Sequence, residues 1–175
     1  MSISSLTQKI PGYGRDIRLN VESVLSPEGA PGLTEAQLVT IALSSAYAVQ
    51  HADVIAAVEG HFAEQITPEL KEASKGAATI MAMNNIYYRF LHLADDKEFG
   101  KLPARLRMSI IGKPGIPKAD FELACLAISA ISGCGMCINA HVHEVRKAEI
   151  SNEAIQSAVR IASVLNAAKQ AIVIV

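Results

Sequence analysis

The chain has 175 residues, of which 50% are hydrophobic and 19% are charged, against roughly 25% charged residues in an average globular protein. This length predicts one domain, and the excess of apolar residues suggests that part of the surface is buried between subunits. Because 16 basic and 17 acidic side chains leave a net charge of −1 and no extended run of Lys or Arg occurs, nucleic acids and anionic membranes are disfavoured as partners.

The N-terminal residues 1–16 lack the hydrophobic segment of a secreted protein, and no later stretch approaches the ~18 consecutive apolar residues of a membrane span. We therefore expect a cytoplasmic protein. Signals for strands are nearly absent, whereas apolar residues recur three or four positions apart along most of the chain, which predicts an all-α fold. The expected helices cover residues 14–25, 34–48, 51–64, 67–92, 104–111, 119–131, 134–149 and 151–172.

A faint internal repeat runs through these helices. Residues 33–38 resemble residues 116–121 at an offset of 83, and residues 66–69 resemble residues 150–153 at an offset of 84. Two anchors at nearly one offset predict two related helical halves within the single domain 1–175. Amphipathic helices also agree by chance, and the low identity leaves that alternative open.

All the cysteines lie in the second of these halves. Residues of about 104–175 contain Cys125, Cys134 and Cys137, whereas residues of about 14–92 contain none. An odd number of cysteines in a chain of this length is not the disulfide framework of a small secreted protein. We therefore expect the second half to carry the chemistry and the first half to act as scaffold and oligomer surface.

The most informative segment runs from Cys134 to His141. On a helix that begins near Cys134, positions i, i+3 and i+7 share one stripe, so Cys134, Cys137 and His141 face the same way. Unpaired N–H groups at a helix N-terminus stabilise a thiolate. A second thiol three residues away can trap a sulfenic acid or a mixed disulfide, and the histidine can hold or transfer a proton. The spacing favours a redox dithiol.

Zinc binding is the competing interpretation, because Cys134, Cys137, His141 and His143 are all potential ligands. His143 is rotated by roughly 200° from His141 on the same helix, so one helix presents three ligands to a single point. Structural zinc sites draw their ligand pairs from separated elements, and the chain has no second CxxC or HxxxH. A catalytic site with three ligands and a water stays open.

Glu122 lies in the apolar segment FELACLAISAI, where a helix would bury part of its carboxyl group. A buried carboxyl group can carry a proton near neutral pH. The alternatives are an exposed acid or an ion pair with Arg105 or Arg107, and the residues alone do not decide between them.

Two further features of the sequence concern buried polar groups. Asn84 and Asn85 interrupt the apolar helix expected over residues 67–92. Helix interiors disfavour Asn, so we expect a buried hydrogen bond across a helix or subunit boundary. Cys125 has the character of a small core residue.

Two segments of the chain resemble the alkyl hydroperoxide reductase D (AhpD) family of the carboxymuconolactone decarboxylase-like superfamily. They are KPGIPKADFELACLAISAISGCGMCINAHVHEV and, upstream of it, ATIMAMNNIYYRF. The likeness extends from DIRLNV near the N-terminus to the final helix. Its specific core is Glu122, eleven further residues, the CxxC of Cys134 and Cys137, three residues and His141.

This resemblance implies an all-α fold of two related halves assembled as a homotrimer. It implies an antioxidant enzyme, a lipoyl-dependent peroxiredoxin reductase that reduces an oxidised AhpC-like peroxiredoxin and has weak alkyl hydroperoxide reductase activity of its own. Electrons would arrive from dihydrolipoyl groups on a 2-oxoacid dehydrogenase component, which dihydrolipoamide dehydrogenase and NADH keep reduced. No cofactor would be bound to the chain itself.

The resemblance also assigns roles to residues. Cys137 matches the reactive cysteine that passes through a sulfenic acid or a mixed disulfide with the partner. Cys134 matches the proton donor and resolving thiol that forms the disulfide, while Glu122 and His141 match a proton relay. Some members of the family have His where this chain has Met136, so a relay step through that imidazole is missing or rerouted here.

Two other functions compete with this one. A carboxymuconolactone decarboxylase-like enzyme or ligand-binding relative with a non-catalytic dithiol would bind a lactone or small acid in either redox state. A zinc-stabilised interaction module would contain about one metal per chain and lose structure with a chelator.

Overall fold

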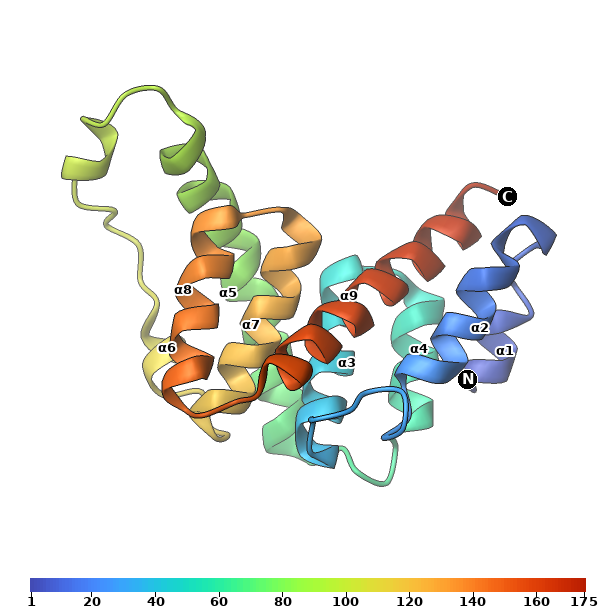
Figure 1. Ribbon diagram of the computed structural model, residues 1–175. Helices are drawn as coiled ribbons and strands as arrows, with labels where there is room; N and C mark the ends of the chain where they lie inside the picture. The colour runs from blue at the N-terminus through green and yellow to red at the C-terminus, as the bar shows by residue number, and fades with distance from the viewer.

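The computed structural model describes all residues 1–175 and contains helices and no strands, which confirms the predicted all-α class (Figure 1). Two 3₁₀ turns, Gly12–Gly14 and Phe99–Lys101, supplement the α-helices. None of the helices combines the length and the apolar composition needed to cross a lipid bilayer. The α-helices are α1 (Ile3–Thr7), α2 (Arg15–Val24), α3 (Glu35–Val49), α4 (Ala52–His61), α5 (Pro68–Leu93), α6 (Ser109–Gly112), α7 (Lys118–Ser132), α8 (Gly135–Lys147) and α9 (Asn152–Val173).

Helices α3 and α7 form the centre of the molecule. Both are buried along most of their length, as expected for helices that are apolar on nearly every face. Helices α5, α7 and α8 stand side by side at one end, and α1, α2 and α4 lie at the other (Figure 1). A small apolar cluster between α5, α7 and the start of α8 contains Cys125, Cys134 and Cys137.

Three pairs of helices begin at nearly the same offset along the chain. Helices α3 and α7 have 15 residues each and begin 83 positions apart. Helices α4 and α8 differ in length but also begin 83 positions apart. Helices α5 and α9 begin 84 positions apart and are both capped by a hydroxyl, from Thr67 and Ser151. Gln50 and Gly133 end α3 and α7 in the left-handed conformation, with φ of 57° and 67°.

One expected helix is wrong. The sequence predicted a helix over residues 104–111, but only Ser109–Gly112 is helical. Arg105 has a φ of 52°, and a left-handed residue interrupts a right-handed helix. Residues 94–108 instead form an arm that leaves the bundle after α5 and returns at α6 (Figure 1). The short helix α1, capped by Ser2, was not predicted.

Candidate active site

The turn between α7 and α8 places Cys134 at the N-cap of α8. Gly133 ends α7, and the N–H of Cys134 donates to the carbonyl of Ser129. The Sγ of Cys134 then accepts a hydrogen bond from the N–H of Cys137 at 3.3 Å. A cysteine sulfur thus fills the place that a Ser or Asp oxygen occupies in an ordinary helix cap. The first turn of α8 directs an N–H group at this sulfur.

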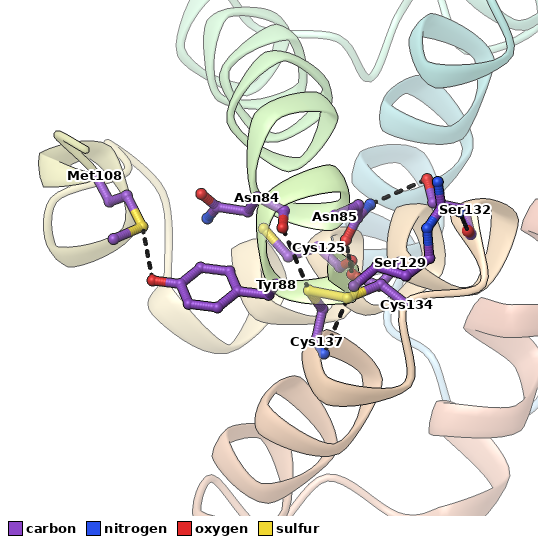
Figure 2. The surroundings of a disulfide bond; sticks show 10 residues. Asn84, Asn85, Tyr88, Met108, Cys125, Ser129, Ser132, Cys134 and Cys137 are labelled. Carbon is purple, nitrogen blue, oxygen red and sulfur yellow. Dashed lines mark hydrogen bonds between the residues drawn. A yellow bond between two sulfur atoms is a disulfide. The ribbon is translucent and has the colours of Figure 1, made fainter. Parts of the chain in front are cut away.

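Cys134 and Cys137 form a disulfide, with their Cα atoms 5.3 Å apart (Figure 2). Cys134 is fully buried, and Cys137 is 5% exposed and lines a cavity. The sulfur of Cys137 lies 3.8 Å from the main-chain carbonyl oxygen of Asn84 on α5, so a reduced thiol there can donate a hydrogen bond to it. Cys137 is therefore the member of the pair that a small molecule in the cavity can reach.

The cavity beside Cys137 has a volume of about 310 Å³ and is mostly apolar. Three segments that are far apart in the sequence form its walls, namely the middle of α5, the arm with α6, and the first two turns of α8. This shape and lining suit a compact apolar ligand with a small polar group. The lining residues are Met81, Asn84, Tyr88, Met108, Ile111, Met136, Cys137, Ala140 and His141.

Glu122 and His141 form a buried pair that links α7 to α8. The Nδ1 of His141 lies 2.6 Å from the Oε2 of Glu122, and the two residues are 8% and 3% exposed. With Nδ1–H donating to the carboxylate, Nε2 is the nitrogen free to exchange a proton. Glu122 makes no ion pair with Arg105 or Arg107. The structure therefore brings together all four residues that the sequence singled out.

The zinc constellation is not assembled. His141 is buried beside Glu122, whereas His143 is exposed on another face of α8. No group of three or more His, Cys, Asp or Glu side chains is arranged to hold a metal ion.

The paired asparagines of α5 have different surroundings. The amide of Asn85 donates to Ser132 Oγ and accepts from Ser129 Oγ, both on α7, at 3.1 Å each. These bonds across the boundary between α5 and α7 account for one of the two asparagines, as expected. Asn84 faces the cavity instead, and its Oδ1 is buried with no hydrogen-bond partner.

Cys125 behaves as a core residue. It is fully buried and unpaired. Burial raises the pKa of its thiol well above the ordinary value, and the charge of Glu122 adds to the effect. Such a thiol is a poor nucleophile.

Sequence reasoning missed the parts of the site that come from outside α7 and α8. Met108 and Ile111 reach the cavity from the arm and α6, and Tyr88 reaches it from α5, with its hydroxyl 3.8 Å from the sulfur of Met108. The adjacent Asn84 and Asn85 in an apolar helix were the one sequence signal that α5 contributes to the site.

Known proteins resemble this chain along most of its length. Residues 97–174 match the family described as "Carboxymuconolactone decarboxylase family". The chain is 46% identical over 168 residues to "Alkyl hydroperoxide reductase AhpD" of Methylocella silvestris, covering 96% of this chain and 93% of that protein. The protein of that name in Brucella suis is 48% identical, with 96% and 94% covered, and that in Rhodopseudomonas palustris is 47% identical, with 94% and 90% covered. This chain therefore belongs to the alkyl hydroperoxide reductase AhpD family.

Proposed function

We propose that this protein is an antioxidant alkyl hydroperoxide reductase in which Cys134 and Cys137 alternate between dithiol and disulfide. The observation that carries the proposal is that Cys137 opens on an apolar cavity also lined by His141, while its partner sulfur is fully buried. Relatives of nearly the same length carry the name of this activity.

The reaction begins with the reduced pair. His141 takes the proton of Cys137, and the carboxylate of Glu122 stabilises the imidazolium through Nδ1–H. The thiolate attacks the terminal oxygen of the hydroperoxide, which forms an S–O bond and breaks the O–O bond. Sulfur is thereby oxidised to a sulfenic acid, and the other oxygen leaves as an alkoxide. Cys134 supplies the proton that converts this alkoxide to the alcohol.

The second step closes the disulfide. The thiolate of Cys134 attacks the sulfenic sulfur of Cys137, and hydroxide leaves and takes the proton held by His141. One dithiol and one hydroperoxide thus yield one disulfide, one alcohol and one water. Met136 stands on the cavity wall without a titratable group, so this route uses only Glu122, His141 and the two cysteines.

The same dithiol serves the proposed partners. Cys137 attacks the disulfide of an AhpC-like peroxiredoxin, and Cys134 resolves the mixed disulfide. A dihydrolipoyl group of a 2-oxoacid dehydrogenase component, kept reduced by dihydrolipoamide dehydrogenase, returns the pair to the dithiol without a bound cofactor. Such a cycle belongs in the reducing cytoplasm.

We further propose the homotrimer that the family resemblance implies. Apolar side chains lie exposed on the last turns of α5 and on the arm, where the chain projects from the bundle (Figure 1). An apolar patch of this kind is typical of a subunit contact. Its members are Ile86, Phe90, Leu93, Phe99 and Leu102.

The test is hydroperoxide turnover supported by dihydrolipoamide, dihydrolipoamide dehydrogenase and NADH. We expect Cys137→Ser to abolish turnover and to retain the helical circular dichroism, whereas Cys125→Ala, which removes the unpaired thiol, retains turnover. After one equivalent of peroxide, mass spectrometry should locate a disulfide between Cys134 and Cys137. Full turnover by Cys137→Ser would overturn the assignment.

A further inference from the structure

Asn84 is a polar residue of the cavity that the reaction described above does not use. It is 4% exposed, and its Oδ1 has no hydrogen-bond partner in the protein. A buried amide oxygen without a partner destabilises the folded state. Asn is also unfavourable in the interior of a helix such as α5. Its neighbour Asn85 is also buried in α5, but its amide forms hydrogen bonds with Ser129 and Ser132. The unpaired Oδ1 of Asn84 therefore suggests that a ligand supplies the missing hydrogen bond.

The position of this amide indicates what the ligand contacts. Asn84 lines the same cavity as Cys137 and His141, and its main-chain carbonyl lies 3.8 Å from the sulfur of Cys137. Its carboxamide extends toward the side of the cavity where Tyr88 and Met108 lie (Figure 2). A molecule that reaches Cys137 from this cavity therefore passes a hydrogen-bonding group that offers both an acceptor and a donor.

We propose that the carboxamide of Asn84 binds the two oxygens of an organic hydroperoxide and holds them beside Cys137. Oδ1 accepts a hydrogen bond from the O–H of the hydroperoxide, and Nδ2 donates to the oxygen that carries the alkyl group. The apolar walls, among them Met81 and Ile111, bind the alkyl group itself. This inference rests on the proposed function and names the group that recognises its substrate.

The amide contributes most where charge develops. As the thiolate of Cys137 attacks the outer oxygen, the S–O bond forms, the O–O bond breaks and negative charge grows on the inner oxygen. The Nδ2–H donates to that oxygen until Cys134 delivers the proton that completes the alcohol. The outer oxygen stays on Cys137 as a sulfenic acid, whose O–H still donates to Oδ1. A fixed donor aimed at developing charge lowers the barrier more than it strengthens substrate binding.

The experiment compares two reactions of the same dithiol. Turnover of cumene hydroperoxide needs the amide, whereas exchange of the reduced protein with the disulfide 5,5′-dithiobis(2-nitrobenzoate) involves no peroxide oxygen. For Asn84→Leu, which keeps the size of the side chain, we expect kcat/KM for the hydroperoxide to fall by about 10²-fold, mainly in kcat. Exchange with the disulfide should stay within about 2-fold of wild type, since the side chain of Asn84 makes no hydrogen bond to either cysteine sulfur.

Three further variants keep the test decisive. Asn84→Ala replaces the leucine variant if the latter does not fold, and Asn84→Gln, which retains a displaced carboxamide, should recover part of the lost kcat. Cys125→Ala removes a thiol that does not line the cavity and should keep near wild-type kcat. Equal losses in both reactions would show a merely structural role and overturn the proposal.

The wild-type protein separates this proposal from the function on which it rests. If wild type turns over the hydroperoxide and Asn84→Leu does so equally well, the assignment of Asn84 is wrong and the proposed function stands. If wild type consumes no hydroperoxide, the proposed function and this inference both fail.

Discussion

Gln37 and Asp120 lie at the same position of two corresponding helices and are hydrogen-bonded to each other. The Nε2 of Gln37 donates to Oδ1 of Asp120 at 2.9 Å across a sequence separation of 83 residues, which is the offset between α3 and α7. The pair joins α3 to α7, and the bond from Thr34 N–H to Gln37 Oε1 fixes the orientation of the amide.

Breaking this pair should destabilise the protein. Both residues are buried, with exposures of 7% and 8%, so Gln37→Leu leaves the carboxylate of Asp120 without its partner. We expect the free energy of unfolding to fall by about 1–3 kcal/mol, measured by urea denaturation. Gln65→Ala, which removes an exposed hydrogen bond to Glu35, serves as the control with a change below about 0.5 kcal/mol. Equal effects of the two substitutions would contradict a stabilising role of the Gln37–Asp120 pair.

The sulfur cap of α8 can be tested with two small side chains. In the reduced protein, Cys134→Ser keeps an atom that accepts the N–H of Cys137, and Cys134→Ala does not. We expect the alanine variant to be less stable than the serine variant by about 1 kcal/mol, compared by urea unfolding in the presence of a reductant. Identical midpoints would mean that the cap contributes nothing to stability.

The hydrogen bond between Tyr47 and Glu59 should make stability depend on pH. The hydroxyl of Tyr47 lies 2.7 Å from Glu59 Oε1. This hydrogen bond is the main cause that holds the pKa of the Glu59 carboxyl below its ordinary value of 4.5, and a hydrogen bond from Lys71 is the second. A lowered pKa stabilises the folded state above the unfolded value, and this contribution is lost as the pH falls through the folded value. Tyr47→Phe should therefore cost about 1 kcal/mol at pH 7 and less at pH 4.

A second tyrosine supplies the control for this pH dependence. The hydroxyl of Tyr13 donates to the main-chain carbonyl of Ala171, which does not titrate. Tyr13→Phe should lower the free energy of unfolding by the same amount at both pH values. A loss for Tyr47→Phe that did not vary with pH would refute the role given to Glu59.

The first half of the chain indicates how the buried pair of Glu122 and His141 can be replaced. At the offset of 83, Val39 and Val58 stand where Glu122 and His141 stand in the second half, and both valines are fully buried. His141→Val alone leaves a buried carboxylate unpaired and should cost about 3 kcal/mol. Glu122→Val combined with His141→Val should recover most of that loss while hydroperoxide turnover stays low. A double variant less stable than His141→Val would contradict this correspondence.

The sequence allowed prediction of those parts of the site that lie on one continuous segment. Cys134, Cys137 and His141 share the start of one helix, so their spacing along the chain was sufficient to group them. The sequence did not show whether Glu122 pairs with His141 or with an arginine, because the contact joins two different helices. Met108 was unpredictable for the same reason, since it reaches the cavity through an arm whose path depends on the left-handed Arg105.

The arm of residues 94–108 contributes both to the cavity wall and to the proposed subunit contact. Met108 forms part of the cavity wall, and Phe99 and Leu102 of the same segment are exposed apolar residues on the proposed subunit contact. A segment held by a neighbouring subunit would hold the cavity wall in place as well. We therefore expect the affinity for hydroperoxide to rise with protein concentration over the range in which subunits associate, so that dilution alone weakens the enzyme.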